Sequence, residues 1–478
     1  MKKYFILVLT TLLICIGTIS ALANPKTMQI ELIHDNFIFT ADDLAYVDEN
    51  EVFVPGSFLQ KNIYQMTYEE GSRQLHGQFS MPKIRLNANK ADDLLFKGFE
   101  INLPTKVISN KPYVNIYGMD KLFGSELLVN DKEEKVIITL KKYTFFNPAN
   151  LSISNKKVSR NEKISLVWQP TFEDENNLAK IDKIQGVNVV SPCWFSIDNQ
   201  WGLVKNQADI AYVKAAKEKG YSVWPLITNS FDPDLTKSIV HNPNARKNVI
   251  KQLLLYVALY NLDGINLDFE NIYEEDREAV SVFVQEISDA LHELNVIVSI
   301  DVTVPSNVSQ WSLSYDRKAY SKSVDYVMLM AYDEHWRTSP VSGSVASIGW
   351  VEQGVENTLK EVPADKLILG IPLYMREWKE TNQSGKTKVE AKTLSMMQSD
   401  ELIKKHKVKL NWLADKGQNY FEFTANNAKY RVWVEDERSI QMKLDLVHQY
   451  KLAGVAGWRK GFEKSEIWKT VNETLFKQ

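Results

Sequence analysis

Two patterns of apolar and polar residues divide the chain. Residues 27–145 alternate apolar and polar side chains over short runs such as MQIELIHDNFIF and KVIITLKKY, which predicts strands joined by polar turns. From residue 164 onward, apolar β-branched runs alternate with stretches such as EAVSVFVQEISDALHEL, whose apolar residues recur at helical spacing. Eight such strands, separated by helices over residues 164–478, predict a (β/α)₈ barrel, the TIM-barrel fold.

The segments that do not fit the barrel repeat predict the remaining organisation. Residues 379–440, between the seventh and eighth predicted strands, are too long for one helix and its loops. We expect an insertion of strands and turns there, because the alternating run NYFEFTANNAKYRVWVEDE lies within it. Residues 146–163 are rich in Asn, Ser and Lys and predict a linker. The barrel at 164–478 would thus follow a small β-rich α+β domain at 27–145.

The start of the chain predicts export. Residues 1–23 have a basic start, an apolar run and the small-residue ending Ala21-Leu22-Ala23, typical of a signal peptide. An uncleaved membrane anchor is the alternative, because the apolar run is nearly long enough to span a bilayer. Cleavage would leave Cys193 as the sole cysteine, which excludes an internal disulfide. We therefore expect a secreted protein, extracellular or cell-wall associated, with no membrane contact after signal cleavage.

Composition and charge narrow the classes of partner. Apolar residues make up 44% of the 478 residues and charged residues 24%, as in ordinary globular proteins. The net charge of −3 gives no electrostatic reason to expect nucleic acid or an anionic membrane as partner. None of the seven histidines falls at metal-ligand spacing, so we expect neither a metal nor another cofactor. We expect a monomer.

One predicted strand carries acidic residues at alternate positions. In LDGINLDFEN, residues 262–271, side chains two apart share a face, so Asn266, Asp268 and Glu270 point one way. Judged by the alternation alone, an edge strand with its polar side in water would be the better explanation. A closed barrel has no edge strand, however, so the polar face should point into the barrel interior. Glu270 would then lie nearest the C-terminal rim, where barrel active sites are found.

The same stretch resembles a known signature. DGINLDFE is similar to the D-x-x-D-x-D-x-E motif of glycoside hydrolase family 18, with Asp263, Asn266, Asp268 and Glu270 at its four acidic positions. Asn266 departs from the motif, since most members have Asp there. MAYDEHW (330–336), GIPLY (370–374) and Trp458 resemble motifs of the sixth, seventh and eighth strands. The combination is closest to the bacterial spore and cell-wall branch, which includes spore cortex-lytic N-acetylglucosaminidases. The N-terminal segment resembles a copper amine oxidase N-terminal-like domain, implying a stalk or wall-targeting module.

The resemblance implies roles for particular residues. Retaining hydrolysis would be substrate-assisted: the acetamido oxygen of N-acetylglucosamine attacks the anomeric carbon, giving an oxazolinium intermediate. Glu270 would protonate the leaving oxygen, Asp268 would orient the acetamido group, and Tyr332 would bind the acetamido oxygen. The residues expected to bind the rest of the sugar are Asn266, Asp333, Trp458 and Tyr374. Asn266 is also expected to hydrogen-bond Asp268, although it cannot titrate.

The resemblance leaves three functions open. The first is a secreted hydrolase of β-linked N-acetylglucosamine in peptidoglycan, and the second a chitinase with the same mechanism. The third is an inactive protein that only binds glycans. A glycan polymer is the expected partner in each case. Trp194, Trp224 and Trp336 either line the groove or pack in the core, and Cys193 is expected to be a small buried apolar residue.

Overall fold

The structure is a computed structural model of the whole chain. It describes residues 26–34, 37–48, 51–55, 57–58, 65–69, 74–78, 100–103, 105–116, 126–140, 162–170 and 183–476, apart from residue 384. The predicted signal peptide at 1–23 lies outside the described residues, as does the predicted linker except for residues 162–163. In the part of the chain described, no helix combines the length and apolar character needed to cross a bilayer.

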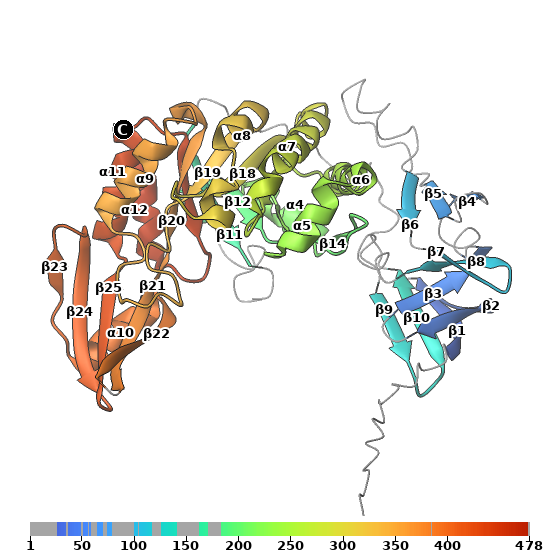
Figure 1. The fold of residues 1–478 in the computed structure, drawn as a ribbon, viewed down its shortest axis with the longest axis horizontal. Helices are drawn as coiled ribbons and strands as arrows, with labels where there is room; N and C mark the ends of the chain where they lie inside the picture. Colours follow the sequence, from blue (N-terminus) through green and yellow to red (C-terminus); the bar gives the residue numbers. More distant parts are fainter. Residues whose placement is uncertain are drawn as a thin grey trace, which may run out of the picture.

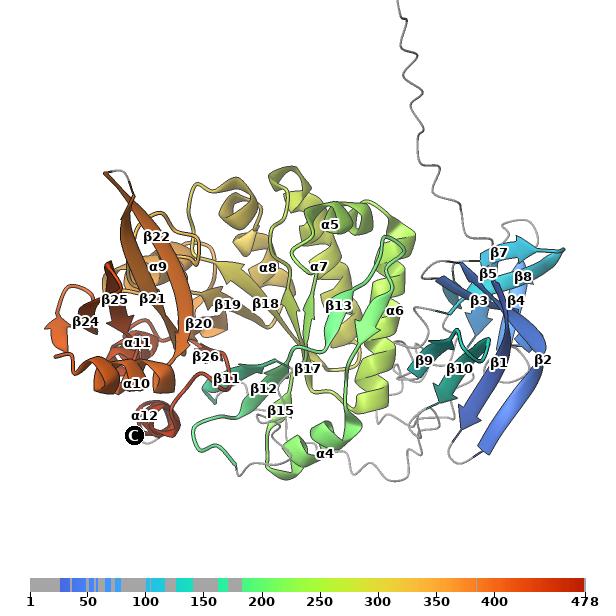
Figure 2. The ribbon, with the colours of Figure 1, turned by 90° about the horizontal axis from the view of Figure 1, so that it is seen from below.

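A closed parallel barrel forms the larger part of the structure (Figures 1 and 2). Its strands, in chain order, are β11 (Ile164–Gln169), β12 (Val189–Pro192), β15 (Ser222–Val223) with β16 (Leu226–Thr228), β17 (Gly264–Asp268), β18 (Ile297–Thr303), β19 (Tyr326–Met330), β20 (Leu367–Pro372) and β26 (Gly454–Trp458). Each pairs in parallel with its neighbour, and β26 returns to pair with β11. The predicted TIM barrel is therefore confirmed.

The third strand of the barrel is interrupted by a proline. Trp224 N donates to Val190 O at 2.9 Å on one side, and Pro225 O accepts from Asn266 N at 2.9 Å on the other. Proline has no N–H to give to a sheet, so the strand is divided into β15 and β16. The two short parts still bond to β12 and β17, and so they close the barrel.

Helices surround the barrel, as Figure 2 shows. They are α4 (Ile210–Glu218), α5 (Pro233–Val240), α6 (Pro243–Tyr260), α7 (Arg277–His292), α8 (Arg317–Ser323), α9 (Ile348–Thr358), α11 (Glu437–Gln449) and α12 (Ser465–Leu475). Short helical turns η4 (Glu274–Asp276), η5 (Ser309–Leu313) and η6 (Ala364–Lys366) and the hairpin of β13 (Phe195–Ile197) with β14 (Val204–Asn206) complete this part. Inward-facing side chains, among them Trp168, Trp224 and Met328, fill the interior of the barrel. They form an apolar cluster that is separate from the main apolar core.

The residues between β20 and β26 include an antiparallel sheet. Its strands are β21 (Tyr374–Gln383), β22 (Lys386–Ser395), β23 (Asn411–Leu413), β24 (Gln418–Ala425) and β25 (Ala428–Val434), in the order β22-β21-β25-β24-β23. Helix α10 (Met396–His406) packs against β21 and β22. Figure 1 shows this inserted sheet at one end of the barrel, next to α9, α11 and α12.

The N-terminal residues form two further sheets. The larger has the order β7-β8-β3-β2-β1-β10-β9 and the smaller the order β4-β5-β6. Their strands are β1 (Lys26–His34), β2 (Phe37–Asp48), β3 (Glu51–Pro55), β4 (Gln65–Glu69), β5 (Gln74–Gln78), β6 (Glu100–Leu103), β7 (Thr105–Ile108), β8 (Lys111–Asn115), β9 (Glu126–Asn130) and β10 (Lys135–Leu140). Alternate residues of β1 and β10, such as Ile30 and Val136, are buried on one face of the larger sheet, as the alternating pattern requires.

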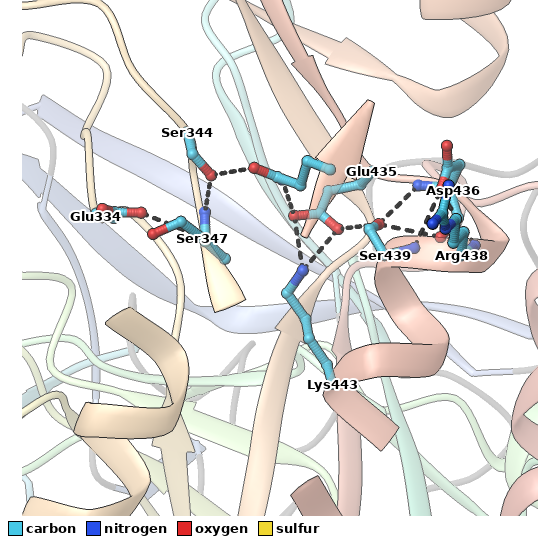
Figure 3. Close-up of polar contacts among 10 residues, drawn as sticks. Glu334, Ser344, Ser347, Glu435, Asp436, Arg438, Ser439 and Lys443 are labelled. Atoms are coloured by element: carbon cyan, nitrogen blue, oxygen red, sulfur yellow. Dashed lines mark hydrogen bonds and ion pairs between the residues drawn. The ribbon is translucent and has the colours of Figure 1, made fainter. Parts of the chain in front are cut away.

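A buried ion pair ties the inserted sheet to the barrel (Figure 3). Glu435 directly follows β25, Lys443 lies in α11, and their charged atoms are 2.9 Å apart with side chains 0% and 1% exposed. The Glu435 carboxylate also accepts from Ser439 Oγ at 2.6 Å and from Gln418 Nε2 at 2.7 Å. Gln418 in β24 accepts in turn from Ser344 Oγ, in the loop after β19, at 2.5 Å. The network therefore connects α11, the inserted sheet and that loop.

Removing one partner of this pair should be strongly destabilising. We expect Lys443→Met to lower the free energy of unfolding by about 3–5 kcal/mol, because the Glu435 carboxylate would be left buried without a counter-charge. Urea unfolding measures the loss. The double variant Lys443→Met with Glu435→Gln should recover much of it, and Lys388→Met, in the exposed pair with Glu390, should cause no measurable change. Equal effects of Lys443→Met and Lys388→Met would contradict this account.

Candidate active site

The polar face of β17 points into the barrel, as predicted. Asn266 and Asp268 are buried among the inward-facing residues, while Ile265 and Leu267 pack outward in the main apolar cluster. Glu270 lies two residues beyond the last residue of β17, at the C-terminal end of the strands. The alternation of side chains along one strand therefore places these three polar groups in one line from the barrel interior to its rim.

Asn229 holds the backbone of Glu270. Asn229 directly follows β16, the neighbour of β17, and its side chain is fully buried. Its Oδ1 accepts from Glu270 N at 3.0 Å, and its Nδ2 donates to Glu270 O at 2.7 Å. These two hydrogen bonds hold the backbone of Glu270, the predicted acid, in place. Sequence reasoning missed Asn229, although a polar residue at the C-terminal end of a barrel strand was a usable signal.

Asn266 does not take the position predicted for it. Its Oδ1 accepts from Trp168 Nε1 at 2.8 Å, and its Nδ2 donates to Asp301 Oδ1 at 2.7 Å and Ser299 Oγ at 3.2 Å. Because indole N–H can only donate, it must face the amide oxygen, which turns the amide N–H groups toward Asp301. The expectation of a hydrogen bond from Asn266 to Asp268 is corrected, since β18 offers the acceptor instead.

The fully buried position of Asn266 also corrects its predicted contact with the sugar. Every polar atom of this side chain faces a protein group behind the carboxylates. Asn266 therefore supports the site from within the barrel. Asp263, at the start of the motif, accepts from Val223 N and pairs with Lys217 at 2.9 Å, which is a structural role.

Burial raises the pKa of each carboxyl group in the interior. Asp268 is 9% exposed, and desolvation raises its pKa to about 7. Burial also raises the pKa of Glu270 well above its usual range, and the charges of Asp268 and Asp333 raise it further. The pKa of Asp301 is raised by burial and then by the charge of Asp268, while the hydrogen bond from Asn266 acts in the opposite direction. These effects favour the protonated form of Glu270, which is the form that a general acid needs.

One oxygen of Asp268 has no partner. Asp268 Oδ1 is buried and accepts no hydrogen bond from any described group. A buried carboxylate oxygen left unpaired is costly and is usually explained by a missing ligand or by function. Asp268 is thus able to accept a hydrogen bond from a bound molecule, directly beside the acid Glu270.

Asp333 lies in the loop after β19, two strands along from β17, and is held by two side chains. Tyr374 Oη donates to Asp333 Oδ1 at 2.5 Å, and the Arg376 guanidinium also donates to that oxygen. The Asp333 side chain remains 43% exposed, so its other oxygen is open to a ligand. Tyr374 is buried with its hydroxyl donated to Asp333, so it supports the position of Asp333. Arg376 was not predicted.

Two aromatic residues border the carboxyl groups. Tyr332 follows β19, and the charges of Asp301, Glu270 and Asp268 add to burial in raising the pKa of its hydroxyl. Trp458, the last residue of β26, is half-buried with its ring centroid 5.9 Å from that of Trp168. The apolar ring of Trp458 therefore lies at the C-terminal end of the barrel, above the interior residues.

The remaining predicted residues separate into core and surface. Trp194 and Trp224 are buried and pack in the core, whereas Trp336 is 52% exposed in the loop after β19. Cys193 is half-buried against the barrel-interior cluster, and burial raises the pKa of its thiol. Among the described residues, no group of three or more His, Cys, Asp or Glu side chains is arranged to hold a metal ion. An acid with a raised pKa near a carboxylate that has an unpaired oxygen suits general acid catalysis.

The chain was compared with known proteins. The family described as Glycosyl hydrolases family 18 matches residues 129–462. An uncharacterized glycosylase, YvbX of Bacillus subtilis, is 32% identical over 60% of this chain and 84% of its own length. The cortical fragment-lytic enzyme of Bacillus subtilis is 27% identical over 51% of this chain and 58% of its own length. The Bacillus cereus spore cortex-lytic enzyme SleL shares the fold, with a TM-score of 0.60, 23% identity and coverage of 66% of this chain and 74% of its own.

Because its pKa is raised on folding, Asp268 should lower the free energy of unfolding of the protein at alkaline pH. A pKa raised from 3.8 to about 7 on folding gives stability that is complete below pH 3.8 and lost as the pH rises through 7. We therefore expect Asp268→Asn to raise the free energy of unfolding at pH 8 by up to about 4 kcal/mol, with no gain below pH 4. Urea unfolding at pH 8 and below pH 4 measures this change in the free energy of unfolding. Asp415→Asn, at an exposed position, is the control and should change neither value.

Proposed function

The chain belongs to glycosyl hydrolase family 18, and we propose that it cleaves β-linked N-acetylglucosamine in peptidoglycan. The observation that carries this proposal is the unpaired buried oxygen of Asp268 near Glu270, whose pKa is raised by burial and by the charge of Asp268. An acetamido N–H is a neutral donor that can satisfy this oxygen, and the N-acetylglucosamine units of peptidoglycan carry such a group. The relatives named as cortical fragment-lytic enzymes support peptidoglycan as the substrate class.

In the proposed mechanism, Glu270 is the general acid. Its proton passes to the glycosidic oxygen as the bond to the anomeric carbon breaks, and the acetamido oxygen of the sugar attacks that carbon. Asp268 accepts the acetamido N–H and, when ionised, stabilises the positive charge of the oxazolinium intermediate. Glu270, now ionised, then takes a proton from the water that opens the intermediate, which restores the acid and retains the configuration.

Three neighbouring residues would hold the sugar in this mechanism. The Tyr332 hydroxyl would donate to the acetamido oxygen, and the exposed oxygen of Asp333 would accept from a sugar hydroxyl. The Trp458 ring would stack against the apolar face of the sugar, because sugar C–H groups pack well on aromatic rings. Tyr374 and Arg376 would keep Asp333 in place without touching the sugar.

A chitinase of the same mechanism is the second candidate. Solved structures that share the fold include proteins described as chitinases, for example one from Chromobacterium violaceum, with a TM-score of 0.60 and 22% identity. Chitin and peptidoglycan offer the same acetamido group, so the described site residues suit both. An inactive glycan-binding protein is disfavoured, because Glu270 and its supporting residue Asn229 are both in place.

We also propose that the protein is exported and that its N-terminal sheets act as a stalk or wall-targeting module. The basic and apolar start of the chain and the alternating strands of residues 26–140 support this. The module would keep a monomeric enzyme close to an insoluble polymer.

Replacement of the acid should abolish hydrolysis. We expect Glu270→Gln to lower kcat on purified muropeptides by about 10²–10⁴-fold, because the amide cannot donate a proton to the leaving oxygen. The release of reducing ends measures the rate. Chitin oligomers are assayed in the same way, as the substrate of the alternative function. Glu274→Gln, an exposed acid four residues further on, should keep the rate of the unmodified protein.

Two results would decide against the proposal. Cleavage of chitin oligomers alone would favour the chitinase. Binding of both glycans without cleavage, by the unmodified protein and by Glu270→Gln equally, would favour the inactive glycan-binding protein.

A further inference from the structure

A third carboxyl group lies beside Asp268 on the neighbouring strand. Strands β17 and β18 pair in parallel, with Gly264 level with Ile297 and Leu267 level with Ile300. The same offset places Asp268 level with Asp301, and both side chains point into the barrel. Paired strands lie about 4.8 Å apart, so two short acids at the same level are close enough to interact strongly.

Asp301 is built into the interior of the barrel. It is 2% exposed, and its Oδ1 accepts from Asn266 Nδ2 at 2.7 Å. Asn266 is itself oriented by Trp168, so the donor that faces Asp301 is fixed. A buried carboxyl group that meets an amide and a second carboxyl group is satisfied best when the two acids hold one proton between them.

We propose that Asp301 is a positioning residue that shares one proton with Asp268 and thereby sets the charge of Asp268 during catalysis. This rests on the proposed function. When the positive intermediate forms, the proton lies on Asp301 and the negative charge on Asp268; when the intermediate is hydrolysed, the proton is shared again. The shared proton stays on one or the other of these two carboxyl groups throughout. The acid that the family motif places at residue 266 is thus supplied by the neighbouring strand.

Every group that faces Asp301 bears on this titration. Asn266 and Asp268 face it from β17, Glu270 from beyond the end of β17, Cys193 from the residue after β12, and Tyr332 from two residues after β19. Cys193 and Tyr332 have raised pKa values and are neutral near pH 7. Burial and the charges of Asp268 and Asp333 raise the pKa of Glu270, which favours its protonated form. The exchange of charge that we propose therefore takes place between Asp268 and Asp301, which lie level on paired strands.

The test moves the acid between the two strands. Asp301→Asn should lower kcat about tenfold, the size of a one-unit change in a protonation equilibrium, and move the acidic limb of the kcat/KM profile to lower pH. Asn266→Asp alone should also lower kcat near pH 7, because two carboxylates would then meet across the 2.7 Å contact. The double variant Asn266→Asp with Asp301→Asn keeps one acid and one amide. It should return kcat to within about threefold of the unmodified enzyme.

A titration independent of turnover completes the test. Carbon-13 NMR of aspartate-labelled protein, with the Asp268 signal assigned from Asp268→Asn, should show a lower pKa for Asp268 in Asp301→Asn. The proposal is overturned if Asp301→Asn keeps both the kcat and the Asp268 titration of the unmodified protein. It is also overturned if the double variant folds but is no more active than Asp301→Asn. If the unmodified protein hydrolyses no glycan, the proposed function fails, while the titration still decides whether the two acids share a proton.

Discussion

Ionising a carboxyl group inside an apolar barrel costs free energy, and this chain places Asp268, Glu270 and Asp301 in one such interior. Each charge that forms raises the pKa values of the other two, so the interior tolerates few charges at once. Burial raises the pKa of all three groups, to about 7 for Asp268, and so favours the protonated form that a general acid such as Glu270 needs.

Hydrogen bonds from neighbouring elements hold the residues at the rim of the barrel. Loops alone would not position the acid Glu270 precisely against the glycosidic bond of a substrate. Asn229 fixes the backbone of Glu270 from β16, and Arg376 in β21 fixes Asp333 and also donates to His335 O. The loop that carries Asp333 continues to Ser344, which is bonded through Gln418 to the buried pair Glu435–Lys443. The inserted sheet thus stabilises one wall of the site while its core lies outside the barrel.

The sequence predicted what depends on periodicity and missed what depends on pairing between strands. Alternation fixes which side chains of β17 share a face, so Asn266, Asp268 and Glu270 were found. Asn229 and Arg376 act through contacts to residues distant in sequence, which no local pattern contains. The partner of Asn266 was wrong because side chains two apart on one strand are separated by about 6.6 Å along it, whereas the neighbouring strand lies about 4.8 Å away. The polar positions Ser299, Asp301 and Thr303 of β18 alternate as those of β17 do, and would have pointed to Asp301.

The exchange of an acid for an amide at residue 266 is best understood together with Trp168 and Asp301. The indole N–H needs an acceptor and Asp301 Oδ1 needs a donor, and an amide supplies both from one side chain without adding a group that can ionise. A carboxylate at 266 would satisfy Trp168 but would oppose Asp301, adding a charge to an interior that already holds three acids. Asn266 is therefore the residue that allows Asp301 to lie level with Asp268. The amide at residue 266 and the acid Asp301 on β18 are then two parts of one arrangement, in which a neutral donor and one carboxyl group lie next to Asp268.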